Sequence, residues 1–369
     1  MVMKKKILAI PHIGTAFGHF YRLASFLDNY IDTHNIYIVI PEPFIAFCVK
    51  YLSPEIQIVP RKIHCSISNP SGIIKNDQYL LLLEENQRIF KNVRPDIVIG
   101  DPGIQAAILS TKYSVEWIGI MHGCYLPFPE SLHMNKELFN LLKVVWSSLN
   151  NQIDKLVSVG TNQIFTSWND LRKTGKIIIP NSKINEPSTI GKYQDINRIV
   201  KPTWNEHSEV DLLITCCSSG TVIPSNEFLT ELSNNSNCKV YVAGINSQNR
   251  IPNVVFLGNN INYKYLVGEN TVVITHGGHG TLQAISKAKK VFMIPSDFDQ
   301  LYNSIVTSAI KGWEIVFDKN WIEIINSGML FRREIYWNNL SIETIDGELV
   351  IKGFDVYEKE RCFNEILVE

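Results

Sequence analysis

The chain has 369 residues, of which 45% are hydrophobic and 19% are charged, and its formal net charge is -1 at pH 7. This composition excludes a largely disordered chain, and the nearly balanced charge gives no sign of nucleic acid as a partner. The length favours two domains of ordinary size over a single one.

Strands and helices alternate through the first half of the chain. Residues 11–20, a loop with two glycines, follow the first strand, and residues 60–78 lack periodicity and are expected to be a loop. The alternation predicts a parallel sheet with helices on both faces. The hydrophobic pattern predicts strands at 6–10, 36–40, 96–100, 117–121, 155–159 and 176–180, and helices at 21–30, 43–52, 78–90 and 104–111.

A polar stretch without periodicity, 185–208, separates the first half from a second half with the same alternation. A hairpin that turns at Asp346-Gly347 and a helix over 357–368 are expected to close the chain. The other expected elements are strands at 211–216, 239–243, 254–257, 271–275 and 291–295, and helices around 228–232 and at 282–290.

The cysteines and the N-terminus bear on the compartment. The seven cysteines are odd in number and scattered, and they form no CxxC or Cys/His zinc spacing, which favours a reduced cytoplasmic compartment. The apolar run 7–10 is too short for a signal peptide and breaks at Pro11, and no apolar run is long enough for a transmembrane helix. We therefore expect a cytoplasmic protein, with a peripheral membrane contact of the first domain left open.

The most informative stretch is the glycine-rich turn between the strand at 271–275 and the helix at 282–290, His276-Gly277-Gly278-His279-Gly280-Thr281. Glycines let backbone N–H groups approach a ligand, and the first turn of a helix has unpaired N–H donors that attract an anion. Thr281 can cap the helix or bind a phosphate oxygen, and His276 lies at the strand end. The alternative is a tight structural turn with two core histidines.

Together with Pro295, Asp299-Gln300 and Asn303, this turn resembles the donor-binding signature of the UDP-glycosyltransferase superfamily, H-x-G-x-G-T followed further along by D-Q-x-x-N. The resemblance is clear over 250–318 and is traceable at 7–30, 94–121 and 211–222. It implies the GT-B fold, in which two Rossmann-like, doubly wound α/β domains face each other across a cleft. The implied parts are an N-terminal acceptor-binding domain at 1–190, a linker at 191–208, a nucleotide-sugar-binding domain at 209–340, and a hairpin and closing helix at 341–369.

The resemblance implies that His19 is the general base for an acceptor hydroxyl and that Asp101 orients it. His19 matches the family's G-H pair in the first loop, and an imidazole can accept a proton near neutral pH. Asp101 follows a strand expected near the first, where its carboxylate would hold the imidazole tautomer and stabilise imidazolium. Three alternatives stay open: His12 as the base, His19 as a capping or pocket-lining residue, and Asp101 as the cap of the helix that follows it.

The resemblance also implies a donor site in which a helix end takes the place of a metal ion. Asp297-Phe298-Asp299 has the form of a metal-binding D-x-D, but we reject that interpretation because it adjoins Gln300 after the glycine-rich turn. Plant members carry Trp and Gln in the nucleobase region, where this chain has Asn259-Asn260-Ile261-Asn262. The expected residues are, for the diphosphate, Ser219, Gly220, Thr221, His276, Gly278, Gly280 and Thr281; for the sugar, Asp299 and Gln300; and for the nucleobase, Asn260 and Ile261.

The sequence therefore predicts an inverting glycosyltransferase that moves a hexose from a nucleoside-diphosphate sugar, UDP first and dTDP second, to a hydroxyl of a hydrophobic small-molecule or lipid-like acceptor. The nucleotide sugar is a co-substrate, and no cofactor or metal is expected. Phe17, Phe20 and residues 122–128 are expected to line the acceptor surface. Two alternatives stay open: another GT-B enzyme, such as a sugar-nucleotide epimerase or hydrolase, and a non-catalytic nucleotide-binding accessory protein.

Overall fold

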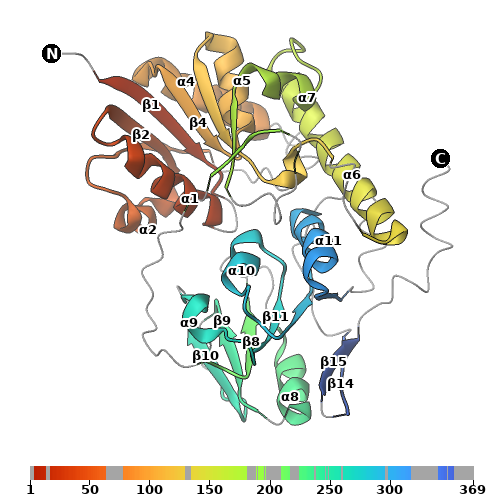
Figure 1. Ribbon diagram of the computed structural model, residues 1–369. Coiled ribbons are helices and arrows are strands. Elements are labelled where there is room, and N and C mark those ends of the chain that lie inside the picture. The colour runs from red at the N-terminus through yellow and green to blue at the C-terminus, as the bar shows by residue number, and fades with distance from the viewer. Residues whose placement is uncertain are drawn as a thin grey trace. The chain divides into compact units, whose positions relative to one another are not determined.

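The computed structural model divides the chain into two compact units, each built on its own parallel sheet (Figure 1). Unit 1 comprises Met1–His133 and Trp146–Ile199, and unit 2 comprises Met134–Val145 and Val200–Glu369. The residues described are 4–13, 17–63, 78–128, 134–180, 188, 190–194, 196, 209–216, 224–236, 238–245, 247, 249–258, 261–295, 298–316, 340–346 and 348–352.

Unit 1 contains a seven-stranded sheet in the order β3-β2-β1-β4-β5-β6-β7, in which every neighbouring pair is parallel. β4 is buried along its whole length, as a strand covered on both faces must be. Pro11 pairs with Asp101 at the carboxyl ends of β1 and β4, so the loops after these strands begin side by side. The strands are β1 (Lys5–Pro11), β2 (His34–Pro41), β3 (Gln57–Arg61), β4 (Ile97–Asp101), β5 (Glu116–Ile120), β6 (Lys176–Ile179) and β7 (Lys192–Tyr193).

Right-handed crossovers place the first two helices of unit 1, α1 and α2, on one face of this sheet and α4 and α5 on the other. α1 buries Phe20, Leu23 and Leu27 in the core that also holds Ile7 and Ile36. Each fully buried apolar side chain of this size contributes roughly 1.5–3 kcal/mol, so this packing fixes the helix that follows β1. The helices are α1 (Gly18–Leu27), α2 (Ile45–Cys48), α4 (Gln78–Val93), α5 (Ile104–Tyr113), α7 (Trp168–Leu171) and α6 (Lys136–Gly160), of which the part up to Val145 is assigned to unit 2. The 3-10 turns are Asp28–Tyr30, Glu42–Phe44, Val49–Tyr51, Gly123–Tyr125 and Arg172–Thr174.

Unit 2 contains a six-stranded parallel sheet in the order β10-β9-β8-β11-β12-β13. Leu266 and Leu282 from its helices, and Ile285 directly after α10, pack on strand residues such as Leu213 and Val273 to form the core. The strands are β8 (Leu212–Thr215), β9 (Val240–Ala243), β10 (Val254–Gly258), β11 (Val272–Thr275), β12 (Lys290–Met293) and β13 (Glu314–Ile315), and the helices are α8 (Asn226–Asn235), α9 (Tyr263–Leu266), α10 (His279–Ala284) and α11 (Phe298–Lys311).

The two sheets share one topology. Counted within each unit, the strand order begins 3-2-1-4-5-6, which is the order of the doubly wound Rossmann fold. The order reverses between β1 and β4 in unit 1 and between β8 and β11 in unit 2. Ligands of such sheets bind outside the carboxyl ends of the strands at the reversal. The predicted fold class, two doubly wound α/β domains, is therefore confirmed.

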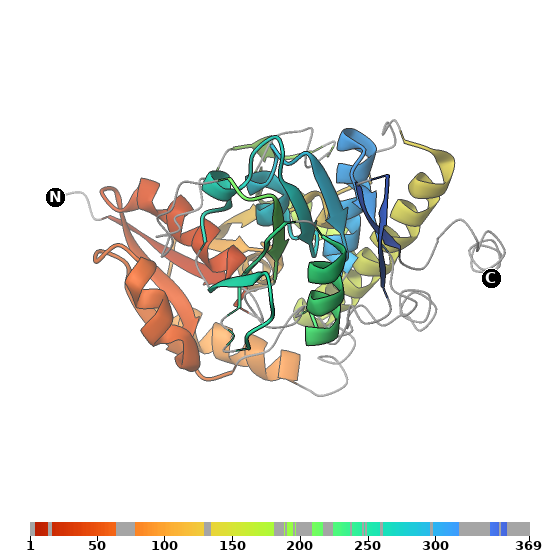
Figure 2. The same cartoon turned by 90° about the horizontal axis from the view of Figure 1, so that it is seen from below.

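The predicted hairpin is also present in unit 2. β14 (Ser341–Ile345) and β15 (Glu348–Lys352) pair antiparallel beside α8 (Figure 2). Thr344 Oγ1 donates to the carbonyl of Asn235 at 2.7 Å, and Lys290 Nζ donates to the carbonyl of Leu349 at 3.3 Å. The hairpin is thus held to the body of unit 2, whereas the predicted helix over 357–368 lies outside the described residues.

Three details of the predicted secondary structure are wrong. β3 was not predicted, because Pro60 and Arg61 hide a strand that lies at the sheet edge, where proline is tolerated. Residues 155–159 are the last turns of α6 and not a strand, since their apolar side chains continue the helical spacing of the preceding turns. The helix after the glycine-rich turn spans His279–Ala284 and is capped by Gly278, so Thr281 does not cap it.

Candidate functional site

Polar residues converge at the strand-order reversal of unit 1. β1 is followed by His12, β4 ends at Asp101, and β5 is followed by His122 in a neighbouring loop. The backbone N–H of His12 donates to the carbonyl of Asp101 at 2.7 Å, which ties the first two of these loops together. His19 lies in the first turn of α1, the helix that leaves the same edge of the sheet.

The structure brings His19 and Asp101 together, as the sequence predicts. His19 Nδ1 lies 2.7 Å from Asp101 Oδ1. The Asp101 side chain is completely buried, whereas 19% of the His19 side chain remains exposed. The alternative that Asp101 caps α5 is not observed, because the N-cap of α5 is Gly103 and no side chain bonds there. A buried carboxylate that holds one nitrogen of a partly exposed imidazole is the arrangement that orients a general base.

Arg22 completes the contacts of Asp101, and the sequence prediction missed it. Its Nε donates to Asp101 Oδ2 at 2.6 Å and its Nη2 donates to Oδ1 at 2.5 Å. Arg22 lies three residues after His19 on α1, so both side chains leave the helix on the same side. The same Nη2 atom is also 2.9 Å from His19 Nδ1. His19 and Arg22 therefore share one oxygen of the Asp101 carboxylate.

Two further histidines surround this group. His122 Nε2 lies 2.7 Å from Arg22 Nη1, and the His122 ring meets the His19 ring edge-on with 5.9 Å between their centroids. The ring of His12 meets that of His19 in the same way at 5.6 Å. His12, the competing candidate for the base, thus lies in the same group of side chains, against the His19 ring.

The charges around Asp101 keep it ionised. Burial by itself would raise the pKa of the Asp101 carboxyl, but the Arg22 guanidinium and the His19 ring outweigh burial and hold that pKa well below its usual range. The carboxylate is therefore negatively charged at neutral pH. No group of three or more side chains that could hold a metal ion occurs within the part of the chain that the structure describes.

The aromatic residues expected to line the acceptor surface behave differently from one another. Phe20 is fully buried in the core of unit 1, so the prediction that it lines a surface is wrong. Phe17 lies against Phe47 with the two rings tilted and 4.2 Å between their centroids, and it meets Phe44 edge-on. Phe128 lies against Trp146. These rings are packed chiefly against one another, which is why their spacing alone does not identify a ligand surface.

In unit 2 the glycine-rich turn follows β11, again at the reversal of strand order. Gly277 has φ +79, a left-handed conformation that favours glycine, and a Cβ there would overlap the Oγ of Ser304. A Cβ at Gly278 would lie 2.5 Å from Nε2 of His276, so the His276 ring lies across this glycine. Both glycines therefore pack closely against side chains of the protein itself, which leaves no room for a Cβ unless those side chains shift.

His276 is buried at the base of the turn. Its Nδ1 lies 3.4 Å from the carbonyl oxygen of Thr215 at the end of β8, and the Thr215 and Thr275 hydroxyls are bonded at 2.8 Å between β8 and β11. Burial lowers the pKa of His276 below its usual value, and the Thr215 carbonyl and the charge of Asp299 only partly oppose this effect. The lowered pKa favours the neutral form of the His276 ring at neutral pH.

The remaining donor residues are distributed as follows. Thr281 is buried in α10, and Asp299 and Gln300 lie in the first turn of α11, with Gln300 buried. Ile261 packs in the core of unit 2. Gly280 follows His279 within α10. The other predicted residues, Ser219, Gly220, Thr221 and Asn260, lie outside the described residues, as does Asp297 of the rejected D-x-D.

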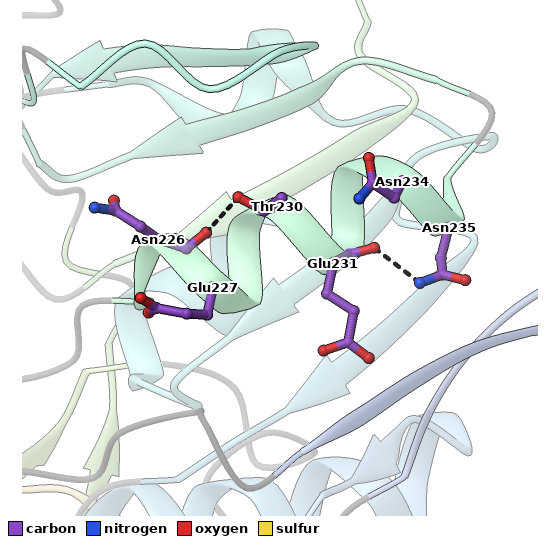
Figure 3. Close-up of a pocket in the computed structure, with 6 residues that line it drawn as sticks. All are labelled: Asn226, Glu227, Thr230, Glu231, Asn234 and Asn235. Atoms are coloured by element: carbon purple, nitrogen blue, oxygen red, sulfur yellow. Dashed lines mark hydrogen bonds between the residues drawn. The ribbon is translucent and has the colours of Figure 1, made fainter.

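A shallow hollow of about 450 Å³ lies elsewhere, along the outer side of α8 (Figure 3). All six residues that line it come from this single helix. Within the helix, the Thr230 side chain donates a hydrogen bond to the carbonyl of Asn226, and the Asn235 side chain donates one to the carbonyl of Glu231. The hollow contains none of the predicted site residues, and we do not treat it as the functional site.

Comparison with known proteins gives a fold but no sequence relative, since no protein-family profile and no curated protein sequence matches the chain. Three similar solved structures illustrate the fold. The glycotransferase of kitacinnamycin is 14% identical, with a TM-score of 0.58 and coverage of 85% of this chain and 86% of its own. The calicheamicin glycosyltransferase CalG4 is 14% identical, with a TM-score of 0.58 and 86% coverage of each chain. Arabidopsis thaliana UGT89C1 complexed with UDP-L-rhamnose is 11% identical, with a TM-score of 0.52 and 86% coverage of each chain.

These similar structures are GT-B glycosyltransferases. The chain therefore has the two-domain GT-B fold. Identities this low define the fold alone, so the activity has to be argued from the residues of the site. No helix in the described part of the chain combines the length and the apolarity that crossing a membrane requires.

Proposed function

We propose that the protein is an inverting glycosyltransferase that moves a hexose from a nucleoside-diphosphate sugar to a hydroxyl of a small-molecule acceptor. The observation that carries this proposal is the pair formed by His19 and Asp101 at the strand-order reversal of unit 1, with 2.7 Å between Nδ1 and Oδ1. A base oriented by a buried carboxylate is what deprotonation of a hydroxyl needs. The GT-B fold supports the reaction class.

In the proposed reaction, Nε2 of His19 accepts the proton of the acceptor hydroxyl while the oxygen forms a bond to the anomeric carbon of the sugar. The bond between that carbon and the diphosphate oxygen breaks, and the diphosphate leaves with the electron pair. A single displacement of this kind inverts the anomeric configuration. Asp101 stabilises the imidazolium that forms on His19.

On the donor side, the turn 276–281 is proposed to bind the diphosphate, where negative charge develops as the bond breaks. Its closely packed glycines and the buried His276 support this role. Burial lowers the pKa of His276, and a bound anion would raise that pKa and so favour the charged ring. Thr281 and the loop at Ser219-Gly220-Thr221 complete the diphosphate site, Asp299 and Gln300 bind sugar hydroxyls, and Asn260 and Ile261 lie at the nucleobase. No metal takes part in this proposal.

The donor and the acceptor are proposed by analogy with the similar structures. UGT89C1 was complexed with UDP-L-rhamnose, and a spinosyn rhamnosyltransferase that is 13% identical to this chain was complexed with thymidine diphosphate. A pyrimidine nucleoside diphosphate, UDP first and dTDP second, is therefore the proposed carrier. The natural products for which these enzymes are named support a hydrophobic small molecule as acceptor, and we propose a cytoplasmic location.

The proposal is tested by incubating the protein with UDP-hexoses and dTDP-hexoses and a panel of hydrophobic phenols and alcohols. The expected product is an acceptor that carries one hexosyl unit with inverted configuration, as measured by mass spectrometry and NMR. Free sugar or an epimerised nucleotide sugar formed without acceptor would support the epimerase or hydrolase alternative. Nucleotide binding without any turnover would support an accessory protein.

A further inference from the structure

We propose that Arg22 is a positioning residue of the His19–Asp101 pair: it clamps the Asp101 carboxylate and shares its negative charge with His19, so that it sets how strongly His19 holds a proton. This inference deepens the proposed function, because it concerns the group that would act as the base. Arg22 is not among the site residues that the sequence predicts.

The clamp is the first part of the argument. Arg22 binds both oxygens of Asp101, Oδ2 through Nε at 2.6 Å and Oδ1 through Nη2 at 2.5 Å. A planar guanidinium that meets a carboxylate through two parallel bonds fixes its rotation as well as its position. The Asp101 side chain is fully buried and 12% of the Arg22 side chain is exposed, so little water competes for these bonds. The oxygen that faces His19 is therefore held in place by Arg22.

The second part concerns the proton on His19. Nδ1 lies 2.7 Å from Asp101 Oδ1 and 2.9 Å from Arg22 Nη2. A lone pair on Nδ1 would face the carboxylate oxygen at the shorter of these distances, so we assign the ring proton to Nδ1, which leaves Nε2 as the free base. A second proton would make the ring a cation. Asp101 would favour that cation and the adjacent guanidinium would disfavour it.

The third part is the anchoring of Arg22 itself. His122 Nε2 lies 2.7 Å from Arg22 Nη1, so a neutral His122 accepts a bond from the guanidinium. The groups that face the His19 ring are thus Arg22 from α1, Asp101 from the end of β4, His122 after β5 and His12 after β1. Among these groups, Asp101 and Arg22 carry fixed charges of opposite sign. The protonation of His19 is therefore balanced between these two charges.

The test follows the titration of the His19 ring nitrogens by NMR, using histidine labelled with 15N and the spectrum of His19→Gln for assignment. Arg22→Met should raise the pH midpoint of this titration by about one unit, because it removes the adjacent cation and leaves Asp101. Asp101→Asn should lower it, because the guanidinium then acts alone. Arg22→Lys keeps the charge but loses the fork, and its midpoint should fall between those of the wild type and Arg22→Met.

Arg22→Met leaves a buried carboxylate without its main partner and could therefore disturb the fold. A second variant serves as the control for this effect. In Arg22→Met/Asp101→Asn the two opposing charges are removed together, so the midpoint should return close to that of the wild type. If Arg22 only supports the fold, the double variant should titrate like Asp101→Asn, and a midpoint in Arg22→Met equal to that of the wild type would equally overturn the inference.

The NMR readout separates this inference from the proposed function, since it needs no substrate. When an acceptor is in hand, the acid limb of kcat/KM should move with the NMR midpoint in each variant. If the midpoints move as expected but the protein has no transferase activity, the proposed function is overturned and the role of Arg22 in sharing the Asp101 charge stands. An active enzyme whose midpoint ignores Arg22 would overturn only the charge sharing.

Discussion

The Nδ1 atom of His19 lies 2.7 Å from the Oδ1 atom of Asp101, although 82 residues separate them in the chain. The contact follows from topology, because Asp101 ends β4, the parallel neighbour of β1, and His19 lies in the helix that leaves β1. Parallel strands bring their carboxyl ends to one edge of the sheet. The chemistry proposed for this protein depends on that relationship.

Replacement of His19 by Asn should abolish most of the transfer without harming the fold. General base catalysis contributes on the order of 10²–10⁴-fold, so kcat/KM should fall by about that factor while nucleotide affinity and the melting temperature stay nearly unchanged. His34→Asn is the matched control, since His34 begins β2 at the opposite edge of the sheet and bonds to Thr33. Equal losses in the two variants, measured by steady-state kinetics, would contradict the assignment.

Replacement of Gly277 by Ala should destabilise unit 2 more than replacement of Gly312. Both glycines have positive φ, +79 and +68, which costs an alanine about 1–2 kcal/mol. A Cβ at Gly277 would also overlap Ser304 Oγ, whereas nothing lies within 4 Å of one at Gly312. Urea unfolding should therefore show a larger loss for Gly277→Ala, accompanied by weaker nucleotide binding that Gly312→Ala does not share.

Ser304 provides a further check on the origin of that loss. If the overlap with Ser304 Oγ causes the difference between the two glycines, Gly277→Ala/Ser304→Ala should recover most of the excess, because it removes that oxygen without placing a glycine inside α11. A double variant as unstable as Gly277→Ala would show that the overlap is not the cause. The comparison needs only denaturation midpoints, so it is independent of any ligand.

His276 should make stability depend on pH. Its folded-state pKa is lowered, first by burial, so below pH 6.5 the unfolded chain binds a proton that the folded protein does not. Its contribution to stability is therefore present above pH 6.5 and is lost as the pH falls below that value. Between pH 7.5 and 5.5 the loss is at most about 1.4 kcal/mol. In His276→Gln the free energy of unfolding should change less over this interval, and an unchanged pH slope would contradict the burial argument.

The sequence made the His19–Asp101 pair and the glycine-rich turn predictable, because each depends on strand ends that hydrophobic periodicity locates well. Four apolar residues before Asp101 and five β-branched residues before His276 identify buried parallel strands, and the turns after them carry the polar groups. Helix boundaries in the short donor segment were less predictable. Gly278 caps α10 where Thr281 was expected, since three glycines and a threonine all satisfy the composition of a cap.

Arg22 and His122 could not be assigned in the same way. An arginine three residues after a histidine is ordinary on a helix surface, and nothing local indicates that its partner is a carboxylate at the end of β4. His122 carried a weak signal, since β5 was predicted directly after β4 and so was expected beside it, which would bring their loops together. Its contact with Arg22 depends on side-chain reach, which sequence periodicity does not report.

The most direct test of the central claim is the binding of UDP, dTDP, GDP and ADP, each with and without magnesium, measured by thermal stabilisation of the wild type, His276→Gln and Thr281→Val. Thr230→Val is the matched control, because Thr230 lies on α8 away from the turn. One pyrimidine diphosphate should raise the melting temperature without magnesium, and the rise should be lost in the two turn variants and kept in the control. No stabilisation by any nucleotide, or a rise that needs magnesium, would contradict the account.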